Sequence, residues 1–117
     1  MRIVLADGQA NVRFALRILL ERQPEVQVVD EAADLGGLLS RIGDTCPDLV
    51  VLDWGLGGAA QADALSILRQ VCPDLAVIAL SGRPEDRRAA LVAGVDAFVC
   101  KTDPLEELLA AITACSK

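Results

Sequence analysis

Five short apolar runs alternate along the chain with longer stretches in which apolar residues recur every three or four positions. The runs lie near residues 2–6, 26–29, 49–52, 75–80 and 98–100, and runs of this length are typical of buried strands. The run at 26–29 alternates only partly between apolar and polar residues, as an edge strand does. The intervening stretches predict helices near 10–22, after Asp34, near 60–71, near 84–93 and near 104–115. This alternation predicts a parallel sheet with helices on both faces.

Boundary residues and apolar faces support the predicted helices. Pro24 lies beyond the end of the first helix, Asp34 can cap the second, and Pro84 stands at the start of the fourth. The apolar face of the second helix consists of Leu35, Leu38, Leu39 and Ile42. No linker or low-complexity segment divides the chain, so one domain over residues 1–117 is expected.

Length and charge restrict the class of protein. The chain has 117 residues with 53% hydrophobic content, yet no apolar run approaches the ~18 residues of a membrane span. No basic segment with a cleavage site opens the sequence, so no signal peptide and a cytoplasmic location are expected. The formal charge of −6 argues against direct binding of nucleic acid by this chain, because such binding needs a basic face.

The cysteines suggest neither a zinc site nor a disulfide framework. They are Cys46, Cys72, Cys100 and Cys115. No C-x-x-C pair occurs and the sequence has no histidine, which makes zinc binding unfavourable. The core is large enough without covalent cross-links, so the four residues are expected to be reduced thiols. The lack of histidine also removes the usual general base for nucleophilic catalysis, and enzymatic activity is not expected.

A polar side chain stands directly after four of the apolar runs. These residues are Asp7, Asp53, Ser81 and Lys101. In an open α/β sheet, ligands bind in the crevice outside the carboxyl ends of the strands, so the four side chains should converge there. Taken singly, each residue has an ordinary explanation, since aspartate and serine often cap helices or occupy turns. Taken together, two carboxylates, a hydroxyl and an ammonium form a site for a cation and a phosphoryl group.

The order of these four residues resembles the receiver domain of two-component response regulators, and the resemblance covers nearly the whole chain. It implies a flavodoxin-like fold of five strands and five helices, with sheet order 2-1-3-4-5. It also implies that Asp53 accepts a phosphoryl group from a histidine kinase, through attack of a carboxylate oxygen on phosphorus. The phosphorylated domain would then change its surface and control an output domain or a partner.

The resemblance assigns roles to further residues. Asp7, Asp53 and the backbone carbonyl of Gly55 would hold Mg²⁺. Lys101 and Ser81 would contact phosphoryl oxygens, and Phe98 occupies the position of an aromatic switch residue. The roles of Gly55 and Phe98 are implied by the family pattern alone.

Two departures from the family pattern matter. The family usually has two adjacent acids after the first strand, whereas this chain has Asp7 followed by Gly8. A metal ligand is therefore missing, and weak Mg²⁺ binding is expected. The family commonly has a proline after the lysine, whereas Thr102 follows Lys101, and a trans peptide bond is expected there.

Two segments, at residues 6–13 and 101–109, resemble receivers that carry a C-terminal helix-turn-helix domain. A DNA-binding output domain would then lie outside this chain. The alternative function is a phosphate-independent receiver that acts as a protein-interaction or ligand-responsive module, because Gly8 replaces a metal-binding acid. The sequence also leaves open a homodimer through the fourth and fifth helices, whose surface mixes Leu91 and Val92 with charged residues.

Overall fold

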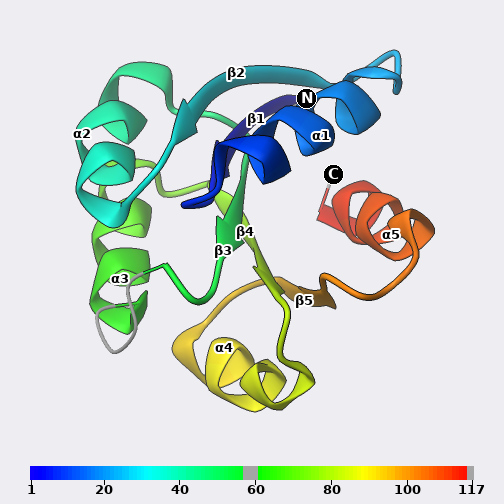
Figure 1. The fold of residues 1–117 in the computed structure, drawn as a ribbon. Coiled ribbons are helices and arrows are strands. Elements are labelled where there is room, and N and C mark those ends of the chain that lie inside the picture. The colour runs from blue at the N-terminus through cyan, green and yellow to red at the C-terminus, as the bar shows by residue number, and fades with distance from the viewer. Residues whose placement is uncertain (57–60, 116–117) are drawn as a thin grey trace.

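The computed structural model describes residues 1–56 and 61–115. Strands and helices alternate along this part of the chain (Figure 1). The strands are β1 (Arg2–Ala6), β2 (Gln27–Ala32), β3 (Leu49–Asp53), β4 (Ala76–Ser81) and β5 (Ala97–Cys100). The helices are α1 (Ala10–Glu21), α2 (Leu35–Thr45), α3 (Gln61–Val71), α4 (Arg87–Ala93) and α5 (Leu105–Cys115). A short 3₁₀ helix, η2 (Pro84–Asp86), precedes α4. Within the described residues, no helix has the length and apolar character needed to cross a membrane.

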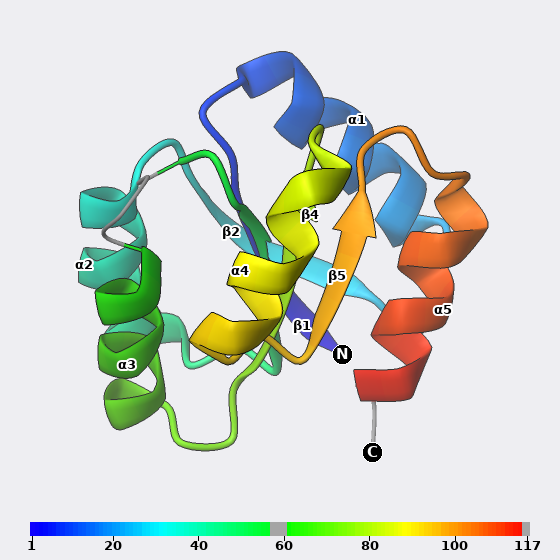
Figure 2. The same cartoon turned by 90° about the horizontal axis from the view of Figure 1, so that it is seen from below.

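The strands form one parallel sheet of order β2-β1-β3-β4-β5, which confirms the expected topology. Two views show α1 and α5 on one face of the sheet and α2, α3 and α4 on the other (Figures 1 and 2). Ala6 pairs with Leu52, and Asp53 pairs with Leu80, so the carboxyl ends of β1, β3 and β4 lie close to level. This register decides which loop residues can meet at the edge of the sheet.

Each face of the sheet has its own core. Side chains alternate along β1, so that Val4 belongs to the core beneath α2, α3 and α4, whereas Ile3 and Leu5 belong to the core beneath α1 and α5. Leu38 and Ile42 of α2 are fully buried in the first core. Burial on both faces explains why the central strands read as continuous apolar runs.

Two element boundaries differ clearly from the sequence predictions, and a third falls partly outside the described residues. β2 extends to Ala32, past the predicted end at 29, because an edge strand can leave Asp30 and Glu31 partly exposed while their backbone pairs with β1. The helix expected near 84–93 begins as η2, and α4 starts only at Arg87. The helix expected near 60–71 is described from Gln61 onward, and residue 60 lies outside the described part.

Two local predictions are confirmed. Asp34 caps α2, since its Oδ1 accepts a hydrogen bond from the backbone of Gly37. The bond between Lys101 and Thr102 is trans, because the described chain has no cis peptide bond.

The expectation that all four cysteines are reduced is wrong for one pair. Cys46 and Cys72 form a disulfide with their Cα atoms 5.8 Å apart. Each stands in a Cys-Pro-Asp turn that leads into β3 or β4, and Ala76 N donates to Asp48 O between the two turns. The repeated turns lie side by side because β3 and β4 are neighbouring parallel strands. The two remaining cysteines, Cys100 and Cys115, are free.

Reduction of the disulfide should lower the free energy of unfolding by roughly 3–4 kcal/mol, because the cross-link restricts the unfolded chain over a long loop. The two cysteines are separated by 26 positions. Urea unfolding with and without a phosphine reductant measures the difference. A Cys46→Ala variant is the control, and its stability should not respond to the reductant. Equal stability of the wild-type chain in both conditions would contradict the prediction.

Candidate functional site

Three of the four polar residues predicted to converge meet at the carboxyl edge of the sheet. Asp7 follows β1, Asp53 ends β3 and Lys101 follows β5. The Nζ atom of Lys101 lies 3.1 Å from Asp7 Oδ2 and 3.5 Å from Asp53 Oδ1. One ammonium therefore bridges two carboxylates that belong to neighbouring strands.

Asp7 is almost completely buried, with only 2% of its surface exposed. Its backbone N–H donates to Ala32 O, which fixes it beside the end of β2, and its Oδ1 accepts a hydrogen bond from Gln9 N. Its Oδ2 accepts no hydrogen bond of good geometry in the described structure and contacts Lys101 as an ion pair. A buried carboxylate needs such a counter-charge, because its transfer out of water is otherwise very costly.

The side chain of Arg13 holds the loop that carries Asp7 and Gly8, and Arg17 shares its partner Glu31. Arg13 of α1 donates through Nη1 to Asp7 O at 2.6 Å and through Nε to Glu31 Oε1 at 3.0 Å. Arg17 donates through Nε to the other Glu31 oxygen at 2.8 Å. Burial acts to raise the pKa of Glu31, but the guanidinium groups of Arg17 and Arg13 outweigh it and hold this pKa below its ordinary value. The loop after β1 is thus fixed from both α1 and β2.

The segment after β3 is held by the side chain of Gln61. Gln61 Nε2 donates to Trp54 O at 2.7 Å and to Asp53 O at 3.3 Å, and the residue is 1% exposed. Asp53 Oδ1 also accepts a hydrogen bond from Gly55 N at 3.2 Å. The sequence interpretation missed Gln61, because a polar residue at the start of a helix gives no sign of the backbone groups that it contacts.

Position 8, which is occupied by glycine, has room for a side chain. A Cβ atom at position 8 would lie 3.5 Å from Leu56 Cδ1 and 3.7 Å from Ala33 O, which are ordinary contact distances. A side chain can therefore be accommodated there, although one neighbour is apolar. Across residues 1–56 and 61–115, no group of three or more His, Cys, Asp or Glu side chains is arranged to hold a metal ion. The site offers two carboxylates, from Asp7 and Asp53.

Ser81 reaches the same edge of the sheet, but its hydroxyl is bound by other residues. Ser81 Oγ donates to Asp86 Oδ2 at 2.7 Å and accepts from Arg83 N at 3.0 Å. A Cβ atom at Gly82 would meet no atom within 4 Å, so space remains beside the serine. The sequence interpretation missed Asp86, whose place behind Pro84 indicates only the start of a helix.

Phe98, the predicted switch residue, is buried in the core beneath α2, α3 and α4. The guanidinium carbon of Arg87 lies 5.1 Å from the centre of its ring, at cation–π distance. The first residue of α4 therefore contacts the aromatic side chain of β5.

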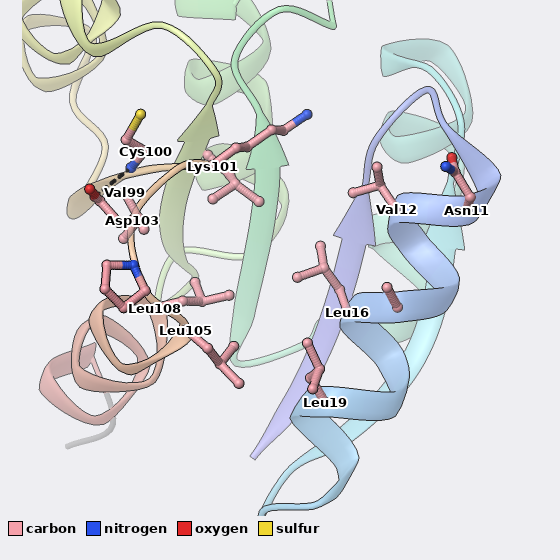
Figure 3. Close-up of a pocket in the computed structure, with 13 residues that line it drawn as sticks. Asn11, Val12, Leu16, Leu19, Val99, Cys100, Lys101, Asp103, Leu105 and Leu108 are labelled. Carbon is pink, nitrogen blue, oxygen red and sulfur yellow. Dashed lines mark hydrogen bonds between the residues drawn. The ribbon is translucent and has the colours of Figure 1, made fainter.

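Lys101 also borders an apolar groove of 410 Å³ between α1 and α5 (Figure 3). Asp103 Oδ2 accepts a hydrogen bond from Cys100 N, which turns the chain directly after β5. In the close-up, the ammonium of Lys101 lies well away from Leu105 and Leu108, which line the lower part of the groove. The groove therefore adjoins the charged site at Lys101.

Comparison with known proteins identifies the family to which this chain belongs. The family model described as the response regulator receiver domain matches residues 3–113. The transcriptional regulatory protein LiaR of Bacillus subtilis (strain 168) is 29% identical over 122 residues, which cover 100% of this chain and 56% of LiaR. The phosphate regulon transcriptional regulatory protein PhoB of Klebsiella pneumoniae is 30% identical over 117 residues, which cover 97% of this chain and 50% of PhoB. The chain thus spans about half the length of these curated relatives.

Solved structures show the same fold. A two-component response regulator of the LuxR family from Aurantimonas sp. SI85-9A1 has a TM-score of 0.87 and 34% identity, covering 97% of this chain and 82% of the other. RcsB from Salmonella enterica serovar Typhimurium, bound to promoter rprA, has a TM-score of 0.87 over 99% of this chain and 60% of its own. Its identity is 23%, so it supports the fold alone.

A Glu31→Gln variant should lose about 1 kcal/mol of unfolding free energy at neutral pH, because the ion pairs of Glu31 with Arg13 and Arg17 are lost. The pKa of Glu31 is lowered in the folded state, so its contribution is present above its unfolded-state pKa and is lost as pH falls through the folded-state pKa. Urea unfolding from neutral pH to below the folded-state pKa measures how the difference between variant and wild type shrinks. Glu25→Gln, at an exposed site before β2, is the control. A difference in unfolding free energy between variant and wild type that stays constant with pH would contradict the role given to the Glu31 carboxylate.

Proposed function

This chain belongs to the family of response regulator receiver domains, and we propose on that basis that Asp53 accepts a phosphoryl group from a histidine kinase. The observation that carries the proposal is the contact of one ammonium, that of Lys101, with the carboxylates of Asp53 and Asp7 at the carboxyl edge of the sheet. Asp53 is 18% exposed at its side chain, whereas Asp7 is almost fully covered, so Asp53 is the accessible nucleophile of the pair.

The proposed transfer uses groups that are already in place. A carboxylate oxygen of Asp53 attacks phosphorus and forms the O–P bond of an acyl phosphate, while the P–N bond to the kinase histidine breaks. The electron pair of that bond returns to the imidazole, which takes up a proton from solvent. The Lys101 ammonium lies beside Asp53 and would bind a phosphoryl oxygen as a point charge. The site therefore supplies a nucleophile and a fixed positive charge.

The oxygen atoms of the site are ligands of the kind that a magnesium ion binds, although they are few. Asp7 Oδ2, which is buried and has no hydrogen bond of good geometry, is an oxygen of the type that a hard cation binds. Asp7, Asp53 and the carbonyl of Gly55 would hold the ion, which when bound neutralises charge on the phosphoryl oxygens. Gly8 adds no ligand, so we expect binding to be weak.

The relatives suggest what the domain controls. LiaR and PhoB are transcriptional regulatory proteins of about twice this length, so we infer a DNA-binding output domain beyond the present chain in a cytoplasmic regulator. The net charge of −6 fits a receiver that does not itself contact DNA. None of the relatives described above supports the phosphate-independent alternative.

Incubation with acetyl phosphate and magnesium should add one labile phosphoryl group to the wild-type chain and none to Asp53→Asn, because the amide is not a nucleophile. Intact mass measures the product. Asp74→Asn is the control, since this exposed residue precedes β4 at the opposite edge of the sheet. Labelling that persists in Asp53→Asn would assign the acceptor elsewhere. Failure of the wild-type chain to react at any magnesium concentration would favour the phosphate-independent alternative.

Restoring an acid at position 8 should strengthen magnesium binding by about tenfold, because ligand charge raises cation affinity. A third carboxylate beside Asp7 and Asp53 should also lower the metal-free unfolding free energy by on the order of 1 kcal/mol. Fluorescence of Trp54, the only tryptophan and the neighbour of Asp53, reports the titration. Gly8→Asn adds nearly the same bulk without charge and is the control for Gly8→Asp. Unchanged affinity in Gly8→Asp would show that position 8 does not face the metal.

A further inference from the structure

The hydroxyl group of Ser81 is occupied by residues of the following loop and of η2. Its described hydrogen bonds go to Arg83 and Asp86, and the residue is 3% exposed. A serine hydroxyl has one proton, and here it is donated to a carboxylate oxygen in a charge-assisted hydrogen bond, with 2.7 Å between Ser81 Oγ and Asp86 Oδ2. While this bond persists, Ser81 cannot donate to a phosphoryl oxygen on Asp53.

We propose that Asp86 is a latch that holds Ser81 in the unphosphorylated arrangement. The inference rests on the proposed function, because it concerns how the site responds to a phosphoryl group on Asp53. Binding of Ser81 to that group requires the Ser81 hydroxyl to break its hydrogen bond to Asp86 Oδ2 and to donate the same proton to a phosphoryl oxygen. The latch therefore competes with the phosphoryl group for a single proton.

Breaking the hydrogen bond between Ser81 and Asp86 would affect α4 and β5, because Asp86 directly precedes α4. Asp86 is the last residue of η2 and immediately precedes α4, and its side chain makes no capping hydrogen bond to that helix. The next residue, Arg87, places its guanidinium over the ring of Phe98. A shift of Asp86 moves the backbone that carries Arg87, and so changes the surroundings of Phe98. The latch thus couples the Ser81 hydroxyl to the α4–β5 side of the domain.

The latch reduces the affinity of the site for a phosphoryl group. Only molecules in which Ser81 is released from Asp86 can use the hydroxyl to bind a phosphoryl group. The apparent affinity is therefore the affinity of the released state multiplied by the fraction of molecules in that state. A hydrogen bond to a charged group makes the latched state the favoured one, so its removal should raise affinity by about tenfold. Asp86 is a positioning residue, since it acts through Ser81.

Beryllofluoride, which mimics a phosphoryl group on a carboxylate, tests the latch by titration of Trp54 fluorescence at fixed magnesium. Asp86→Ala should bind it about tenfold more tightly than the wild-type chain. Glu85→Ala is the matched control, because it removes the neighbouring acid, which contacts Arg83 and not Ser81. In a Ser81→Ala background, Asp86→Ala should give no gain. Equal binding by Asp86→Ala and Glu85→Ala, or a gain that persists without Ser81, would overturn the proposal.

A second measurement needs no phosphoryl analogue. The chain has two phenylalanines, so labelling with fluorophenylalanine gives one ¹⁹F signal for Phe98 and one for Phe14, which is 65% exposed on α1 and serves as the reference. Asp86→Ala and Ser81→Ala should move the Phe98 signal in the same direction, whereas Glu85→Ala should leave it in place. A Phe98 signal that stays at its wild-type position in Asp86→Ala would overturn the latch. If no variant binds beryllofluoride, the proposed function fails, while the ¹⁹F signals still decide whether the latch exists.

Discussion

A carboxylate that is almost completely removed from water needs a counter-charge, and for Asp7 that charge is the ammonium of Lys101. The two residues belong to opposite ends of the chain and follow strands that are not neighbours in the sheet. Their contact is possible because β3 and β4 lie between them and end at nearly the same level. The Lys101 side chain crosses that edge and passes Asp53 on the way. The geometry of the proposed phosphorylation site is thus a consequence of strand register and of one buried charge.

Helix positions and the meeting of Asp7, Asp53 and Lys101 could be predicted from sequence, because each depends on local periodicity and on the residue that ends a strand, whereas the strand order was implied by the family resemblance. The partners Asp86 and Gln61 could not, because their roles depend on loop conformations that bring specific atoms together. The disulfide was missed for a different reason. The expected sheet order already made the strands after the two Cys-Pro-Asp turns neighbours, but the cysteines were expected to be reduced because a core of this size does not need a cross-link.

The disulfide and the charged site lie at opposite ends of the same two strands. Cys46 and Cys72 stand at the entries to β3 and β4, whereas Asp53 and Ser81 stand at the exits. The cross-link closes a covalent loop that contains Asp53, the residues after it and α3. It therefore restricts the segment that carries Asp53 without touching the site itself, and the loop of Ser81 lies outside the closed segment.

The absence of an acid at position 8 changes the charge balance of the ligand-free site. Two carboxylates face one ammonium here, whereas a receiver with an acid at position 8 would hold three negative groups against the same lysine. Fewer like charges make the metal-free state less strained, and the same deficit weakens attraction for a cation. In the proposed phosphorylation, a weakly held metal would leave the site more dependent on Lys101 and on the Ser81 hydroxyl to bind phosphoryl oxygens. The hydrogen bond from Ser81 to Asp86 would then have more influence than it would beside a tightly bound cation.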